Sequence, residues 1–431
     1  MEEALLTVVF VAILFFLLGT GVWVGLALLG VALTGMALFT TRPAGDAMVT
    51  TIWTASSSWT LTALPLFIWM GEILFRTRLS EDLFKGLAPW MARLPGGLLH
   101  VNVAGCALFA AISGSSAATV ATVGKMSIPE LRARRYAEPM TIGTLAGAGT
   151  LGLLIPPSII LIVYGVTVNE SIAKLFIAGI LPGLMLALLF MGYIAVHATL
   201  RPGIAPETAV AVPLAEKLRN SISLVPVILL ILAVLGSIYT GVATATEAAV
   251  LGVAGGLILS ALQGSLTRES FTESLMGATR TSCMIALILA GSAFLSLAMG
   301  FTGLPRELAL AIDALDLSPL TLILALTVFY IVLGCFLDGI STVVLTMAVV
   351  EPMIRQAGID LLWFGIYLVI VVEMAQITPP IGFNLFVLQG MTGHDIGYIA
   401  RAALPMFFIM CLAVAIVVAF PEIVTFLPAR L

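Results

Sequence analysis

The chain has 431 residues, of which 61% are hydrophobic and 10% are charged. A soluble domain is about 45 to 50% apolar and about 25% charged, so this composition excludes a soluble protein and indicates a chain embedded in a membrane throughout. The formal net charge of -4 offers no broad basic surface for nucleic acid.

Apolar stretches recur along the whole chain. A helix needs about 20 apolar residues to cross a bilayer, and about ten stretches satisfy that length. The predicted crossings are residues 4–19, 22–40, 59–75, 140–165, 172–197, 221–239, 243–264, 281–299, 361–389 and 398–420. The first lacks the basic start and cleavage site of a signal peptide, so we expect it to stay as a membrane helix. Residues 80–91 and 267–278 have the pattern of amphipathic helices in the membrane interface.

Two further apolar stretches, residues 94–128 and 318–350, are each interrupted by a small polar cluster, at 112–119 and 337–342. Each half is too short to span a bilayer, which predicts a re-entrant helical hairpin in each stretch. Two tightly joined crossings are the alternative.

The charges that flank the two hairpins differ in sign. Eight basic and four acidic residues leave +4 around the first hairpin, and two basic and five acidic residues leave -3 around the second. Lys and Arg mark the cytoplasmic side, so the first hairpin is expected to open to the cytoplasm and the second to the outside.

The two halves of the chain share one spacing plan. A hairpin glycine precedes a Pro-Pro pair by 42 residues in the first half and by 40 in the second, and a further proline follows 26 residues after the first proline of each pair. The positions are Gly114, Pro156 and Pro182, and then Gly339, Pro379 and Pro405. The chain is therefore predicted to be one membrane domain, residues 1–431, with inverted repeats over about 22–197 and 243–420, a plan found in secondary transporters.

The proline pairs and the hairpin tips are the candidate binding elements. Two consecutive prolines unwind a helix, and irregular backbone at membrane depth is tolerated where it lines a cavity or is buried in protein. Free carbonyls suit a cation and free amides suit an anion, and neutral oxygens with one carboxylate favour a monovalent cation such as sodium over a divalent one. Packing of small residues is the alternative explanation for the serine cluster.

The predicted sodium ligands come from the two tips and the two proline breaks: Ser113, Gly114, Ser116, Leu154, Pro156, Asp338, Gly339, Ser341, Thr342, Ile377, Thr378 and Pro379. The predicted substrate contacts lie between the tips: Ser115, Ser116, Thr119, Pro157, Ser341, Thr342, Pro380 and Asn384.

Three acidic residues within or at the ends of the predicted helices need an account of their own, because such groups are costly there and are often functional. Glu72 lies near a helix end and reaches the interface. Glu247 lies at a helix start, where a cap is expected. Glu373 is more central, and it either holds the broken segment in place or carries a proton. The four cysteines stand apart without metal-ligand spacing, so no transition metal site and no cofactor are predicted.

The assembled motifs resemble the large membrane subunit, of DctM type, of the tripartite ATP-independent periplasmic (TRAP) transporters. The motifs that carry the resemblance are residues 113–119 with 128–131, 154–158, 175–183 and 377–384. The resemblance implies a sodium-coupled importer of a small organic acid in a bacterial inner membrane. It implies a small four-helix membrane subunit of DctQ type as a separate chain, a periplasmic binding protein of DctP type, and an elevator-type architecture.

Other functions remain as alternatives. A stand-alone ion-coupled carrier would need no binding protein, and a channel would conduct far faster than a carrier. An intramembrane protease would need a base near the serines or a second carboxylate facing Asp338, and the sequence provides neither convincingly. Dicarboxylates, sugar acids, keto acids and sulfonates all remain open as substrates.

Overall fold

The computed structural model describes residues 2–430 apart from 78, 202, 205–212, 304–317 and 381, and leaves out the side chains of 2–8, 11 and 79–81. Four of the charges counted beside the second hairpin, Arg306, Glu307, Asp313 and Asp316, lie outside the described residues. The described part is all helical, as predicted.

Many of the helices begin at a Ser, Thr or Asp whose side chain caps the first turn. The α-helices are α1 (Glu2–Gly19), α2 (Val24–Phe39), α3 (Ala44–Ser56), α4 (Ala63–Phe75), α5 (Leu79–Met91), α6 (Leu99–Ser113), α7 (Ser116–Ala133), α8 (Glu138–Gly149), α9 (Leu151–Leu154), α10 (Ile159–Val168), α11 (Ile172–Leu200), α12 (Leu214–Ser221), α13 (Val225–Tyr239), α14 (Ala245–Leu262), α15 (Arg268–Thr302), α17 (Pro319–Gly334), α18 (Gly339–Gln356), α19 (Leu361–Gln376), α20 (Phe383–Thr392), α21 (Ile396–Ala419) and α22 (Glu422–Thr425). Short 3-10 turns occupy Trp59–Thr62, Ile222–Leu224 and Pro428–Arg430.

Within the described residues, five helices are long and apolar enough to cross a membrane, or up to seven if each bent pair counts as one span. Several predicted crossings are therefore not single straight helices. Trp59–Phe75 is bent by 55° from α3, and α10 is bent by 41° from the helix over Glu138–Leu154. The predicted crossing 361–389 is divided into α19 and α20.

One expectation about an individual helix was wrong, and one helix was missed. The segment 267–278 is not a separate interfacial helix, because it forms the start of α15, which runs unbroken for 35 residues. Since Gly277 is the one glycine and no proline lies in that first part, nothing interrupts the helix there. Helix α3 was not predicted at all, because its Thr, Ser and Asp residues make it too polar for an apolar-length criterion.

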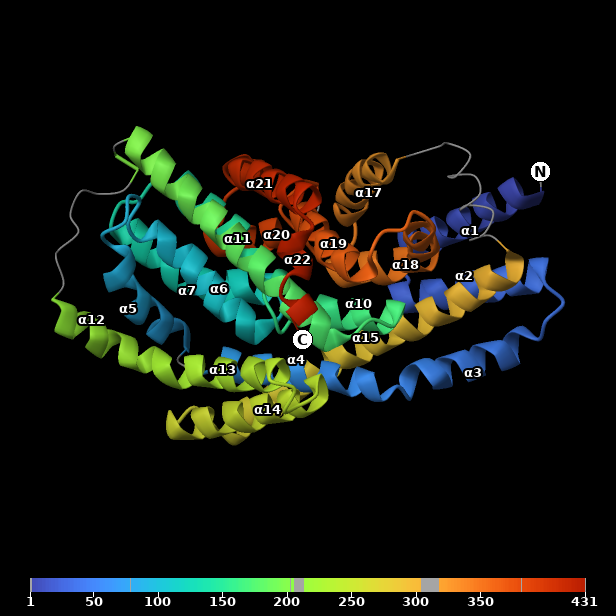
Figure 1. Ribbon diagram of the computed structural model, residues 1–431, viewed down its shortest axis with the longest axis horizontal. Helices are drawn as coiled ribbons and strands as arrows, with labels where there is room; N and C mark the ends of the chain where they lie inside the picture. The colour runs from blue at the N-terminus through green and yellow to red at the C-terminus, as the bar shows by residue number, and fades with distance from the viewer. Residues whose placement is uncertain are drawn as a thin grey trace.

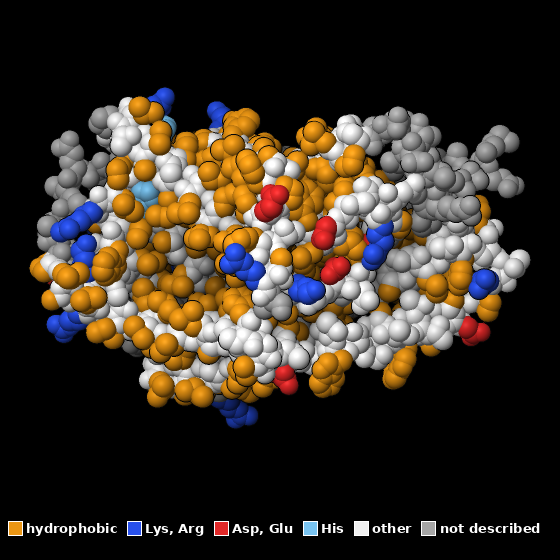
Figure 2. All heavy atoms as spheres, viewed as in Figure 1, with side chains coloured by type: hydrophobic (Ala, Val, Ile, Leu, Met, Phe, Trp, Pro, Cys, Tyr) orange, Lys and Arg blue, Asp and Glu red, His pale blue; other side chains and the backbone are white. Residues whose placement is uncertain are grey.

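One group of helices packs around α15. Helix α15 lies against α2, α3 and α4, and α14 lies against α4 and α13. Of these, α3, α4, α13 and α14 run along one long edge of the molecule, and α2 and α15 lie beside them (Figure 1). Apolar side chains cover much of the visible face (Figure 2), as expected for a surface that meets lipid.

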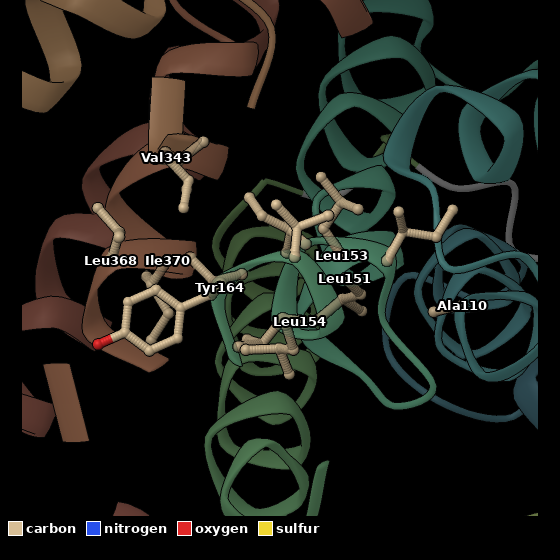
Figure 3. Packing of buried hydrophobic residues seen from close by; sticks show 14 of the residues in the cluster. Ala110, Leu151, Leu153, Leu154, Tyr164, Val343, Leu368 and Ile370 are labelled. Carbon is tan, nitrogen blue, oxygen red and sulfur yellow. The ribbon is translucent and has the colours of Figure 1, made fainter. Parts of the chain in front are cut away.

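The second group contains the hairpins and the broken helices. Helices α6 and α7 pack on each other, as do α17 and α18, and α10 and α19 lie in contact between the two pairs. Figure 3 shows the buried leucines of α9 between Ala110 of α6 and Val343 of α18. Both hairpins therefore reach one shared core, which holds the candidate site.

Candidate functional site

At the first hairpin tip, several hydroxyl and carbonyl oxygens lie close together. Gly114 ends α6 with φ +57, a left-handed conformation that favours glycine, and Ser115 caps α7. The Ser113 and Thr119 hydroxyls lie 2.9 Å apart, and the Thr119 hydroxyl donates to the Ser115 carbonyl at 2.7 Å. Ser113, Ser116 and Thr119 are all buried. The tip thus gathers three neutral oxygens within hydrogen-bonding reach of one another.

The first proline break packs directly on this tip. A cis bond joins Pro156 to Pro157, and a Cβ added to Gly114 would lie 2.9 Å from the Pro157 carbonyl oxygen. A Cβ on Gly152 would lie 2.6 Å from the Ser115 carbonyl oxygen. The predicted meeting of this tip with this break is therefore present, and backbone contacts backbone at both points.

The sequence predicts that the backbone carbonyls of the first break face the first tip, but only some of them do. The Leu154 carbonyl oxygen lies beside α11, where a Cβ on Gly179 would come within 2.9 Å of it. The Leu153 carbonyl accepts a hydrogen bond from the Ser158 hydroxyl. The Pro157 carbonyl, assigned from sequence to the substrate, is the one that lies against Gly114.

The second tip repeats the first with one change. Asp338 caps α18, and its carboxylate accepts from the Ile340 and Ser341 amides at 3.1 and 3.2 Å. The Thr342 hydroxyl donates to the Asp338 carbonyl at 2.8 Å, as Thr119 does to Ser115. Ser341 and Thr342 are buried, but Asp338 is exposed. Its carboxylate acts as a helix cap here, a role that the sequence-based assignment to sodium did not include.

The second break is more open than the first. Pro379 and Pro380, joined by a cis bond, are both exposed, whereas Ile377 is buried and Thr378 is half-buried. The Thr378 hydroxyl donates to the carbonyl of the preceding turn, at Met374, at 2.7 Å.

The second tip lies beside the last turns of α19, before this break. A Cβ on Gly339 would lie 3.0 Å from a methyl carbon of Val372. Gly339 also faces Leu153 and Ile160 of the first half, at 3.6 and 3.4 Å from the same Cβ position.

The two halves therefore meet across α9 and α19. Gly152 of α9 lies against the first tip and Leu153 against the second. Helix α19 packs against α9, and its residue Val372 touches the second tip. Residues from both halves therefore lie in one part of the molecule, and the shared site between the tips stays a prediction.

Three buried polar side chains on the second broken helix have atoms without partners. Both carboxylate oxygens of Glu373, the side-chain nitrogen of Gln376, and both amide atoms of Asn384 have no hydrogen-bond partner among the described residues. Asn384 was predicted from its place in the proline motif. Gln376 was missed, although its position three residues after Glu373 predicts that both lie on one helix face.

The other two acidic residues singled out from the sequence, Glu247 and Glu72, have structural roles. Glu247 and Thr244 form a capping box at the start of α14, which confirms the cap predicted for Glu247. Glu72 pairs with Arg76 one turn later, and Arg76 also reaches Glu273 of α15 at 3.4 Å. This small ion network joins α4 to α15.

The oxygens at the first tip are uncharged. The first tip provides neutral oxygens, and within the described residues no group of three His, Cys, Asp or Glu side chains is placed to hold a metal. Divalent ions favour several carboxylates, whereas the oxygens at the first tip belong to hydroxyl and carbonyl groups.

The family model of the tripartite ATP-independent periplasmic transporter, DctM component, matches residues 11–423. The chain belongs to this family. The DctM family is one of transporter permeases, which excludes the intramembrane protease considered from the sequence.

Individual relatives support the assignment of this chain to the DctM family. It is 32% identical over 374 residues to the C4-dicarboxylate TRAP transporter large permease protein DctM of Pseudomonas aeruginosa, covering 86% of this chain and 87% of that protein. It is 31% identical to the isethionate TRAP transporter permease protein DctMQ of Oleidesulfovibrio alaskensis, covering 96% of this chain and 64% of that protein.

A solved structure supports the fold. The YdaH transporter of Alcanivorax borkumensis superposes with a TM-score of 0.65 at 14% identity, covering 93% of this chain and 98% of that one. At this identity the similarity concerns the fold alone.

Proposed function

We propose that this DctM family permease imports a small organic acid into a bacterium across the inner membrane, coupled to inward sodium flow. The observation that carries the proposal is the contact of the first hairpin tip with the first broken helix, which gathers neutral oxygens at Gly114 and Pro157. A related arrangement at Asp338 beside α19 provides the second ion site. Sodium is cargo in this account, and no resident cofactor is needed.

The partners follow from the same proposal. A separate small four-helix membrane subunit binds the permease, and a periplasmic binding protein delivers the acid. The relative named DctMQ is longer than this chain, since the matched region covers 64% of it. The hairpins with α8 to α10, α19 and α20 move as one body against the layer of α2, α4, α13, α14 and α15.

The test is uptake into vesicles that contain the permease, the small subunit and the binding protein. We expect uptake of an organic acid in a sodium gradient and none in an equal choline gradient. Equal uptake in both gradients contradicts sodium coupling, and full uptake without the binding protein favours a stand-alone carrier.

A further inference from the structure

A glycine on α4 is the point where the helices packed around α15 meet the first hairpin tip. A Cβ added to Gly71 would lie 3.2 Å from the Ile112 carbonyl oxygen and 3.3 Å from both the Cα and the carbonyl oxygen of Ser113. Carbon atoms are at their best separation at about 3.5 to 4.0 Å, so a side chain here would be crowded. Gly71 therefore lets the backbone of α4 lie directly against the backbone of the first tip.

The surroundings of this contact are apolar. A small cavity adjoins it, and every side chain that lines this cavity is apolar, including Met70 of α4, Ile112 of α6 and Pro157 of the first break. Attraction between such groups has no preferred direction, and each contact is weak. The shape of α4 at Gly71 therefore determines how closely the first tip approaches the layer.

The second hairpin is held to the same layer by a hydrogen bond. The Ser292 hydroxyl of α15 donates to the Val344 carbonyl of α18 at 2.7 Å, and both residues are buried. A buried hydroxyl that loses its acceptor is unfavourable. The bond therefore favours the position of α18 that is seen in the structure.

The two contact points belong to one frame. Helices α4 and α15 pack on each other (Figure 1), and the Trp69 indole of α4 donates to the Ser274 hydroxyl of α15 at 3.3 Å. On the side of the hairpins, α9 touches both tips. A movement of the two hairpins along the layer therefore has to leave the contacts at Gly71 and Ser292 together.

We propose that Gly71 and Ser292 are positioning residues for transport, which together hold the body that carries both hairpins in the place seen in the structure. The missing side chain of Gly71 leaves room for the first tip, and the Ser292 bond stabilises the second hairpin. This inference deepens the proposed function and rests on it, since it requires that the body moves against the layer of α2, α4, α13, α14 and α15. Changing either residue shifts the body away from this place and removes no proposed ion ligand.

The experiment measures the distance between two spin labels by pulsed electron spin resonance. One label is attached at position 250 on α14, in the layer, and the other at position 324 on α17, in the moving body. Val250 and Leu324 are 51% and 58% exposed, so both positions can be labelled without disturbing the core. The four native cysteines are replaced by alanine, so that only these positions react. The protein with no further change is expected to show two distances, one of them that of the structure.

Three variants are compared in this labelled protein. Ser292→Ala is expected to lower the ratio of the structure's distance to the other distance by about twofold to tenfold. Gly71→Ala is expected to lower it by about fivefold to a hundredfold, although alanine favours a helix more than glycine does. Gly256→Ala on α14 is the matched control and leaves the ratio unchanged, because its Cβ would lie 3.5 Å from Ile73 of α4, an ordinary contact.

The outcomes separate this inference from the proposed function. Two distances whose ratio stays the same in both Gly71→Ala and Ser292→Ala overturn the inference and leave the moving body in place. A single distance before any of these changes, with and without sodium, contradicts the moving body and the inference with it. The expected shifts in a protein that shows no sodium-dependent uptake support the positioning roles and count against the proposed transport.

Discussion

The two hairpin tips follow one plan but differ in how tightly they are held. At the first, Gly114 and Gly152 bring backbone against backbone, and Pro156 and Pro157 are buried. At the second, Gly339 meets side chains, and Pro379 and Pro380 are exposed. The comparison teaches that a repeated spacing does not impose equal packing. The first tip is held by backbone contacts and the second by side-chain contacts, so we expect the first tip to be the more rigid of the two.

The largest expected effect on stability and uptake comes from replacing Gly152, beside the first tip, or Gly339, in the second tip, with alanine. In Gly152→Ala the new carbon lies 2.6 Å from the Ser115 carbonyl oxygen and 2.7 Å from the Ser116 Cα, so the backbone must move. We expect a loss of about 1 to 3 kcal/mol and loss of sodium-dependent uptake. Gly339→Ala meets the Val372 side chain at 3.0 Å, and its effect is smaller in thermal unfolding. Equal losses in the two variants contradict the difference in rigidity.

The next effect concerns ions and leaves the fold intact. Ser116→Ala and Asp338→Asn are each expected to abolish sodium-dependent uptake while the protein remains in the membrane at normal amounts. Asparagine caps helices as well as aspartate does, whereas Asp338→Ala loses the cap and about 0.5 to 2 kcal/mol of stability. Undiminished uptake in Ser116→Ala and Asp338→Asn removes both residues from the ion sites.

A smaller effect on stability is expected when one hydroxyl is removed at each of the two proline breaks. Ser158 caps α10 and also bonds the buried Leu153 carbonyl, so Ser158→Ala should cost about 1 to 2 kcal/mol. Thr378 bonds only to the carbonyl one turn earlier and is half-buried, and Thr378→Ala should cost less. Denaturant unfolding of both variants measures the difference, and a larger loss for Thr378→Ala would run against the comparison.

The smallest effect is expected for a surface ion pair in each hairpin. These two pairs serve as a control, because their removal should change stability equally little in both hairpins. Glu130 pairs with Arg134 on α7 at 3.1 Å, and Glu351 pairs with Arg355 on α18 at 2.8 Å, each one turn apart. The pairs are at least partly exposed, so Glu130→Gln and Glu351→Gln should each change stability by about 0.5 kcal/mol or less. A large loss in only one of them means that the hairpins differ in more than the tips.

The sequence predicted the positions of the helix breaks well because these depend on local chemistry, whereas the ligands assigned to them stay predictions. Gly114, Asp338 and the two proline pairs end or start helices whatever surrounds them, and the structure has breaks at each. The packing partners were less predictable, since they depend on contacts far apart in the chain. The Leu154 carbonyl lies against α11 because Gly179 leaves room there, and no local pattern shows that.

The errors in the fold have the same cause. A criterion of apolar length cannot see a polar helix such as α3, and it divides α15 where polarity rises although the helix continues. Gln376 was missed because one polar residue at the end of an apolar helix has no motif. That its buried side-chain nitrogen lacks a hydrogen-bond partner among the described residues can be seen only in the three-dimensional structure.

The most direct test of the account is hydrogen exchange of the purified permease in sodium chloride and in choline chloride. We expect sodium to slow exchange at both tips and both breaks, with the greater change in residues 338–342 and 376–380, because the first tip is already tightly packed. Identical exchange in the two salts at all four segments contradicts sodium binding at the hairpin tips.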